Sequence, residues 1–420
     1  MELLMHLFAK KWGNMPLANV HYSMLTARNG ITRVSNVVSV GSWSNSALGI
    51  SANSVQLRRG VNNDSLNAIL YPPSGRSASY GPFMDRTFQG ESYGYFSGGA
   101  PAGPVDYFGS TPYEKVYGGT IGPKANTIQK FPFSSDLGIS INGVLTVGRY
   151  GTSSTGSKTH GYTAGGFTSA PPISSFDVID KFSFSSDANA TDVGETSIAR
   201  SHMASAFSTV AGYAMGGASA TPANLPNNSQ IDYTDIDKYP FSSDTPATDI
   251  GNLTSGKMYP AGHSSTTHGY SSGGESNPGE SLVIDKFSFS SDVGGTNIGS
   301  LSLARAGGAG ISSTTNGYNL AGMTGPGSAT DVVDKFPFSS DTNATDIAEL
   351  SNYNDFNAAI SSTERGYYNS APNNGQSATI TYFNYVSDTT YANRTQGITE
   401  AVSRTSGTQV WHYVNLTLDL

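Results

Sequence analysis

The sequence contains no cysteine. A disulfide framework, a thiolate metal site and a cysteine nucleophile are therefore excluded. A chain without cysteine is compatible with either an oxidising or a reducing compartment, so cysteine usage leaves the compartment open.

Charge is also scarce, because only 13% of the residues are Asp, Glu, Lys or Arg. The 31 acids and 23 bases give a net charge of -8, and no basic region stands out that could neutralise a phosphate backbone. We therefore expect no nucleic-acid partner. Helical bundles and coiled coils need surfaces rich in Glu, Lys and Arg, so this composition excludes them as well.

Long hydrophobic runs are missing too. The apolar run from Leu3 to Phe8 is too short to cross a bilayer, and its flanks, Glu2 and Lys10, do not suit a signal peptide. We expect Met1–Trp12 to form a short amphipathic anchor helix, and we expect no membrane insertion.

A repeat accounts for most of what is present. The segment Lys181-Phe-Ser-Phe-Ser-Ser-Asp187 recurs at intervals of 51, 57, 48, 49 and 47 residues, measured between the aspartates. The other copies are Lys130–Asp136, Lys238–Asp244, Lys286–Asp292, Lys335–Asp341 and a degraded copy at Tyr382–Asp388. A period near fifty residues is typical of a repeat architecture.

Three further landmarks accompany the copies, the first in all six and the other two in four each. About twenty residues earlier comes Gly-Tyr followed by a pair of small residues, as in Gly161-Tyr162 with Gly165-Gly166. After the aspartate comes a segment such as Thr191-Asp-Val-Gly194, and then a basic residue before a run of small residues. The basic residues are Arg149, Arg200, Lys257 and Arg305.

These landmarks predict four antiparallel strands in each repeat: the small-residue run, the Gly-Tyr segment, the Lys-Phe segment and the Thr-Asp segment. In the third strand, period two places Asp180 and Phe182 on one face and Ile179 and Lys181 on the other. Apolar groups on both faces suit a sheet packed between two others, and Gly-Gly suits crowded backbones. The fold predicted is therefore all-β, a β-propeller of four-stranded blades.

The number of blades depends on the chain ends. Six repeats span about residues 86–394, and the tail offers two more strand-like segments, Ala401–Arg404 and Val410–Val414. If Ile31–Val40 and Ser54–Leu57 supplied the other two strands, a seventh blade would close the ring, so seven blades are expected, with six as the alternative. We assign residues 1–85 to an N-terminal segment for attachment or ring closure, and 86–420 to the propeller.

The pattern resembles the kelch repeat, with its strand ending in Gly-Gly, a later aromatic pair and a basic residue before the next strand. It departs from kelch because Asp192, Asp249, Asn297 and Asp346 occupy the tryptophan position. The turn at Ser290, Asp292, Gly294 and Thr296 is also similar to the Asp box of sialidase-type propellers. We interpret the turn aspartates as structural acceptors of backbone N–H groups, with calcium ligation as the alternative; they are Asp136, Asp187, Asp244, Asp292 and Asp341.

No catalytic constellation is evident. The aspartates before lysine and the basic residues recur once per repeat, which favours a structural role, and His160 and His268 also occupy equivalent positions. The histidines show no metal-binding spacing, and the glycine-rich segments lack the following helix that a phosphate site needs. We expect no enzyme activity, no metal and no cofactor.

Binding is a better prediction, because the repeats differ most between their second and third strands. These connections carry aromatic residues that suit contact with protein or carbohydrate, unless the rings pack the loops themselves. The candidate residues are Tyr107, Phe108, Tyr113, Tyr117, Phe176 and Tyr233.

The wording of the repeats, Ile-Asp-Lys-Phe-Pro-Phe-Ser-Ser-Asp with His-Gly-Tyr-x-x-Gly-Gly, resembles that of propeller proteins of marine phages, including cyanophages. That resemblance implies a non-catalytic virion structural protein, such as a tail fibre or tail-associated protein. It implies other virion proteins as partners, a host-surface glycan or protein as a further partner, location in the virion, and scope for a homo-oligomer. The alternative is a carbohydrate-active or glycan-binding propeller, either a sialidase-like depolymerase or a lectin.

Overall fold

The structure is a computed structural model, and the residues that it describes are all strands, turns and connections. They are residues 31–34, 37–40, 48–51, 54–57, 69–70, 84–98, 126–133, 140–168, 174–219, 231–276, 279–325, 328–350, 358–369, 380–391 and 406–415. The chain divides into two compact units, Met1–Arg86 with Tyr413–Leu420, and Thr87–His412. Within the described residues there is no helix, and hence none that could span a membrane.

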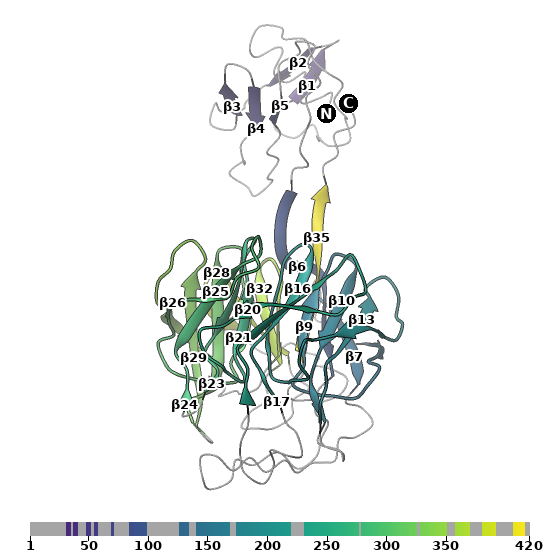
Figure 1. Cartoon of the computed structure of the whole chain (residues 1–420). Helices are drawn as coiled ribbons and strands as arrows, with labels where there is room; N and C mark the ends of the chain where they lie inside the picture. The colour runs from purple at the N-terminus through teal and green to yellow at the C-terminus, as the bar shows by residue number, and fades with distance from the viewer. Residues whose placement is uncertain are drawn as a thin grey trace. The chain divides into compact units, whose positions relative to one another are not determined.

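The larger unit contains six four-stranded sheets, the blades of a propeller (Figure 1). Blade 1 has the order β35 (Ser406–Asn415), β6 (Met84–Ser97), β7 (Thr127–Pro132), β8 (Ser140–Val144). Blade 2 has β9 (Ser153–Gly156), β10 (His160–Ala164), β13 (Val178–Ser183), β14 (Thr191–Glu195), and blade 3 has β15 (Ala204–Phe207), β16 (Ala211–Met215), β19 (Asp235–Pro240), β20 (Thr248–Asn252). Blade 4 has β21 (Ala261–Ser264), β22 (His268–Ser272), β25 (Val283–Ser288), β26 (Thr296–Ser300). Blade 5 has β27 (Ala309–Ser312), β28 (Asn316–Met323), β29 (Ala329–Pro337), β30 (Thr345–Glu349), and blade 6 has β31 (Ala359–Ser361), β32 (Arg365–Asn369), β33 (Ile380–Asn384), β34 (Thr389–Tyr391).

In each blade the four strands are called a, b, c and d from the innermost outward. Short two-stranded sheets extend three of the connections between strands b and c. They are β11 (Phe167–Thr168) with β12 (Ser174–Ser175), β17 (Ala218–Ser219) with β18 (Ile231–Asp232), and β23 (Glu275–Ser276) with β24 (Gly279–Glu280).

The prediction of seven blades is wrong, and the alternative of six is confirmed. Val410–Val414 lies in β35, which takes the position of strand a in blade 1 beside β6, so no seventh blade is formed. Blade 1 begins in the sequence with its strand b, which carries Gly94-Tyr95, and the C-terminal strand supplies the missing inner strand. The chain ends do share a blade, as expected, but the shared blade is the first.

The N-terminal segments expected to complete a seventh blade pair within the smaller unit instead. β1 (Ile31–Val34) pairs with β2 (Val37–Val40), while β3 (Leu48–Ser51), β4 (Ser54–Leu57) and β5 (Ile69–Leu70) form a separate sheet. These hairpins satisfy their hydrogen bonds locally. The expected anchor helix at Met1–Trp12 lies outside the described residues.

Aromatic side chains join every blade to the next. The strand b tyrosine packs against two aromatic residues of strand c in the following blade, and the second of these stacks on it with ring centroids 4.8 to 5.2 Å apart. The sets are Tyr95 with Phe182 and Phe184, Tyr162 with Tyr239 and Phe241, Tyr213 with Phe287 and Phe289, Tyr270 with Phe336 and Phe338, Tyr318 with Phe383 and Tyr385, and Tyr367 with Phe131 and Phe133. The last set joins blade 6 to blade 1 and closes the ring.

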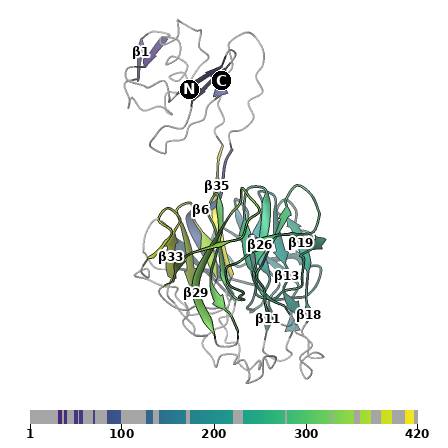
Figure 2. The same cartoon turned by 90° about the vertical axis from the view of Figure 1, so that its left-hand side faces the viewer.

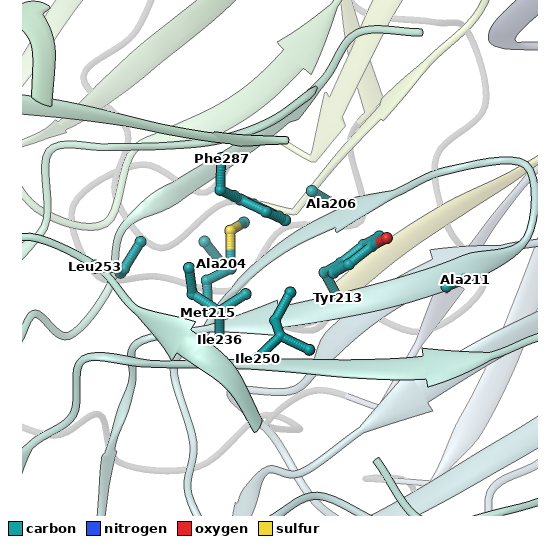
Figure 3. Packing of buried hydrophobic residues seen from close by; sticks show 9 residues of the cluster. All are labelled: Ala204, Ala206, Ala211, Tyr213, Met215, Ile236, Ile250, Leu253 and Phe287. Carbon is teal, nitrogen blue, oxygen red and sulfur yellow. The ribbon is translucent and has the colours of Figure 1, made fainter. Parts of the chain in front are cut away.

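Figure 3 shows one of these interfaces, in which Phe287 of blade 4 lies against residues of blade 3. Met215 and Ile236 of blade 3 are fully buried there. Alternation along strands b and c produces this core, because one apolar face of each blade meets the neighbouring blade.

The inner strands are rich in Gly, Ala and Ser because adjacent blades approach most closely near the axis. A Cβ atom at Gly262 would lie 2.1 Å from the carbonyl oxygen of Ser205 in the preceding blade, so no larger residue fits without movement of the backbone. Serine hydroxyls also bridge these strands. Three successive backbone N–H groups, those of Phe207, Ser264 and Ser312, donate to the Oγ atoms of Ser264, Ser312 and Ser361 at 2.9 to 3.1 Å.

Candidate functional site

The connections between strands lie on two faces of the propeller. On one, which we call the loop face, strand b leads to strand c and strand d leads to the next strand a; on the other, the turn face, the a-to-b and c-to-d turns lie. In Figures 1 and 2 the short strands β11, β17, β18, β23 and β24 gather at one end of the propeller, on the loop face. Sequence variation between repeats is largest there, so the loop face is the candidate functional site.

The charged residues of the repeat are used for contacts within the propeller, beginning with the turn aspartates. Each described turn aspartate faces the strand c lysine of the preceding blade, as in Lys181 Nζ to Asp244 Oδ1 at 2.7 Å and Lys238 Nζ to Asp292 Oδ1 at 2.7 Å. The remaining pairs are Lys130 with Asp187, Lys286 with Asp341, and Lys335 with Asp388. This partner was not predicted, although the signal was present, because lysine and aspartate recur together in every intact copy. Asp136 lies outside the described residues.

Backbone acceptance of the Asx type occurs a few residues later in the repeat, on strand d. The side chain of Asp192 accepts a hydrogen bond from the N–H of Gly194 at 3.1 Å, and Asp249 accepts one from Gly251 at 2.9 Å. The residues in the kelch tryptophan position thus hold the outer strand in shape.

Four buried ion pairs connect the loop face to strand c. Arg149 lies 2.9 Å from Asp180, and both side chains are fully buried. The corresponding pairs in blades 3, 4 and 5 are Arg200 with Asp237, Lys257 with Asp285 and Arg305 with Asp334, at 2.8 to 2.9 Å. The expectation that these basic residues are copies of one structural position is confirmed, so they are not a substrate-binding arginine cluster.

Backbone carbonyls complete the coordination of these cations. Arg149 also donates to the carbonyl oxygens of Gly165 and Thr163 at 2.7 and 3.1 Å. Burial lowers the pKa of Arg149 and of Lys257, and the paired carboxylates Asp180 and Asp285 oppose that shift. Each basic side chain is therefore placed directly against a buried aspartate inside the blade.

The end blades lack this pair at the same register. In blade 2, Asp180 lies opposite Thr163, the residue that follows the strand b tyrosine. The position on strand c opposite that residue can be compared between blades. Gln129 in blade 1 and Thr381 in blade 6 hold that position, and both are buried. A neutral side chain needs no buried counter-ion. At this register, the two blades that meet at ring closure therefore carry no buried charge.

The Gly-Gly corners couple the loop face of one blade to the next. Gly165 and Gly166 have φ of +60° and +113°, and the N–H of Gly166 donates to the carbonyl oxygen of Arg200 at 3.0 Å. Gly217 and Gly274 make the same bond to Lys257 and Arg305, at 2.9 Å. The left-handed backbone explains why the sequence repeats glycine here.

Two of the six predicted binding residues can be placed, and both are half-buried on the loop face. The N–H groups of Phe176 and Tyr233 donate to the carbonyls of Gly166 and Gly217 at 2.8 Å, and Ser281 takes this position in blade 4. The contact that recurs between blades is this backbone hydrogen bond, so the side chain at this position can differ from blade to blade. Tyr107, Phe108, Tyr113 and Tyr117 lie outside the described residues.

A series of backbone hydrogen bonds links successive blades on the loop face near the inner strands, and nothing in the sequence predicted it. It joins the residues two positions after the basic residues, Gly151, His202, Tyr259 and Gly307, which all have φ between 57° and 68°. From His202 onward, each N–H donates to the carbonyl of the previous member at 2.6 to 3.0 Å. The ring centroids of His202 and Tyr259 lie 4.3 Å apart, so an aromatic pair stands where blades 2 and 5 have glycine.

The described residues show no arrangement typical of catalysis. The Nδ1 atoms of His160 and His268 contact the Oγ1 atoms of Thr159 and Thr267 at 2.8 Å, in equivalent turns. His263 is buried against Ser272 and the carbonyl of Ile311. Within the part of the chain that is described, no three His, Asp or Glu side chains gather in a way that could hold a metal ion.

Comparison with known proteins shows the fold alone. No family model matches the chain, and no curated protein matches it. The solved structure of YjhT is similar, with a TM-score of 0.50 and 13% sequence identity, over 63% of this chain and 88% of that one. This similarity supports a β-propeller and says nothing about activity.

Proposed function

We propose that this chain is a non-catalytic binding scaffold, a structural protein of a phage virion of the tail-fibre or tail-associated kind. In this proposal the N-terminal segment anchors the protein and the loop face contacts a host surface or another virion protein. The virion part is supported by the resemblance of the repeats to marine phage propeller proteins.

The observation that carries the binding role is the internal use of the repeated charges. The acid and base of each central repeat pair with each other inside the propeller, and the turn lysines and aspartates pair between blades. What remains to differ between blades is the set of loop-face connections, which the closed ring of six blades carries. Variable loops on a fixed scaffold are the usual arrangement of a binding protein.

The test is to purify particles from the natural source by density gradient, detect the chain by mass spectrometry and determine a cryo-EM map of the particle. We expect the chain in the particle, with residues 1–80 packed against other virion chains and the loop face exposed. Absence of the chain from particles contradicts the virion role, and hydrolysis of a host glycan by the purified chain contradicts the non-catalytic role.

A further inference from the structure

The two faces of the propeller differ sharply in charge. On the turn face the described bases and acids nearly balance. The bases are Lys130, Lys158, Lys181, Lys238, Lys286, Lys335 and Arg365, and the acids are Asp187, Asp244, Asp292, Asp341, Asp388 and Glu364. The described residues named here therefore carry a formal charge close to zero. The exposed Asp192, Asp249 and Asp346 lie on the outer strands d and are counted with neither face.

Among its described charged residues, the loop face of blades 2 to 5 exposes only carboxylates. They are Asp177, Asp232, Asp235, Glu275, Glu280 and Asp331, all partly exposed, with Glu195 and Glu349 at the ends of strands d. The bases of these connections are Arg149, Arg200, Lys257 and Arg305, which are at most 1% exposed and paired with buried aspartates. Arg200 also lies 3.6 Å from the partly exposed Asp235. The undescribed stretches between strands b and c of these blades, 169–173, 220–230, 277–278 and 326–327, contain no charged residue in the sequence.

Aliphatic side chains are exposed among these carboxylates. Leu282 and Leu303 are 40% and 39% exposed, and Val147 and Ile231 are similarly open. Exposed aliphatic groups are often part of a protein interface, and charge of one sign favours a partner surface of the opposite sign.

We propose that the loop face of blades 2 to 5 is a docking surface for a basic protein, one that presents lysine or arginine beside aliphatic side chains. This deepens the proposed function, from which it takes the loop face as the binding face. Repulsion disfavours anionic partners at this face, so acidic polysaccharides, nucleic acids and anionic membranes are poor ligands there.

The experiment uses the full chain and fluorescence anisotropy with three labelled peptides, of alternating lysine and leucine, lysine and serine, and glutamate and leucine. We expect the lysine–leucine peptide to bind more tightly than the other two and to weaken as salt increases. Equal affinity for the lysine–leucine and lysine–serine peptides overturns the role of the aliphatic groups.

The location is tested with Glu280→Lys/Asp331→Lys. The control is Val210→Lys/Glu364→Lys/Val386→Lys, which changes the net charge equally but lies in turns of the turn face, where Val210 and Val386 are exposed. The first variant is expected to bind the lysine–leucine peptide about tenfold more weakly, and the control to stay within about twofold of the parent. Equal losses in both variants overturn the proposal. Glu280→Gln/Asp331→Asn keeps the test valid should the lysine variant fold poorly, with an intermediate loss expected.

Failure here is distinguishable from failure of the proposed function. The peptide assay needs no particle, and detection of the chain in particles needs no peptide. A chain found in particles whose binding ignores the loop-face charges retains the virion role and loses this partner class.

Discussion

At the scale of single residues, the repeated Gly-Tyr shows how an aromatic neighbour dictates a glycine. Gly161 lies directly opposite Phe182 in the sheet, and a Cβ at Gly161 would lie 2.3 Å from the Phe182 ring. The ring covers the glycine while Tyr162 beside it packs against the next blade. The glycine therefore makes room for the aromatic contact between blades.

Gly161→Ala is expected to destabilise the protein by roughly 2 kcal/mol, because the ring of Phe182 must move out of a filled interface. Gly279→Ala is the matched control, since no atom lies within 4 Å of a Cβ built there. Urea denaturation of both variants measures the effect. Equal stability of the two variants contradicts this account of the glycine.

His263 supplies a test by pH. Burial lowers its pKa from the ordinary 6.5 to about 4, so the folded protein holds the ring neutral while the unfolded chain binds a proton below pH 6.5. The contribution of His263 is thus complete above pH 6.5 and is lost as pH falls from 6.5 toward 4. Between pH 7 and pH 5 the loss is about 2 kcal/mol.

His263→Thr, which introduces the residue that blade 2 has at this position (Thr155), is expected to lose less stability between pH 7 and pH 5 than the parent. Urea denaturation at the two pH values gives the difference. His268→Asn is the control, because His268 is half-exposed and blade 5 has Asn316 in its place. An unchanged pH dependence in His263→Thr refutes the assignment.

At the scale of strands and blades, two lysines of neighbouring blades make ion pairs that we expect to contribute very differently to the stability of the fold. Lys238 meets Asp292 on the turn face, where the Asp292 side chain is 59% exposed. Lys257 meets Asp285 with both side chains fully buried. The first pair competes with water, whereas loss of the second cation leaves an uncompensated charge in the core.

Lys238→Gln is expected to cost at most about 1 kcal/mol, and Lys257→Gln about 3 to 5 kcal/mol. Chemical denaturation of the two variants compares them directly. Lys257→Arg should keep most of the stability, because three other blades have arginine there. Similar losses in the two Gln variants would show that the buried pair is not a structural requirement.

The sequence predicts the strands of a blade well, because landmark residues recur in each copy and each has a local reason to be there. Strand c of blade 2 lies at Val178–Ser183, and it includes Ile179 to Phe182, the residues whose alternation predicted it. The partners of the landmarks were not predictable in the same way. Arg149 and Asp180 lie 31 positions apart, and only the folded blade shows that they meet.

The prediction of seven blades was wrong for a related reason. The alternation in Val410–Val414 is the same for an inner strand or for its neighbour, so position in the sheet depends on pairing with β6, more than three hundred residues earlier. For the candidate site, the sequence located the variable connections. Only the structure shows the backbone hydrogen bonds of Phe176 and Tyr233. It also shows that the basic residues are buried inside the blades.

At the scale of the whole molecule, ring closure depends on β35. Removal of residues 406–420 leaves β6 with an unpaired edge in blade 1, and exposed edges promote association between chains. We expect this truncated chain to form oligomers or aggregates in light scattering after size exclusion, while removal of residues 416–420 leaves the oligomeric state of the parent. A stable monomer without β35 would contradict the closing role of that strand.

The aromatic contacts described above all have the same direction around the axis. Each blade contacts the following blade through its tyrosine and the preceding blade through its aromatic pair. Such a contact is directional, like the head-to-tail interface of a cyclic oligomer, and six of them close a circle. Any run of consecutive blades thus ends in one half of the contact and begins with the complementary half. Two three-blade fragments of this chain therefore possess, at both of their junctions, the surfaces needed to find each other and rebuild the ring.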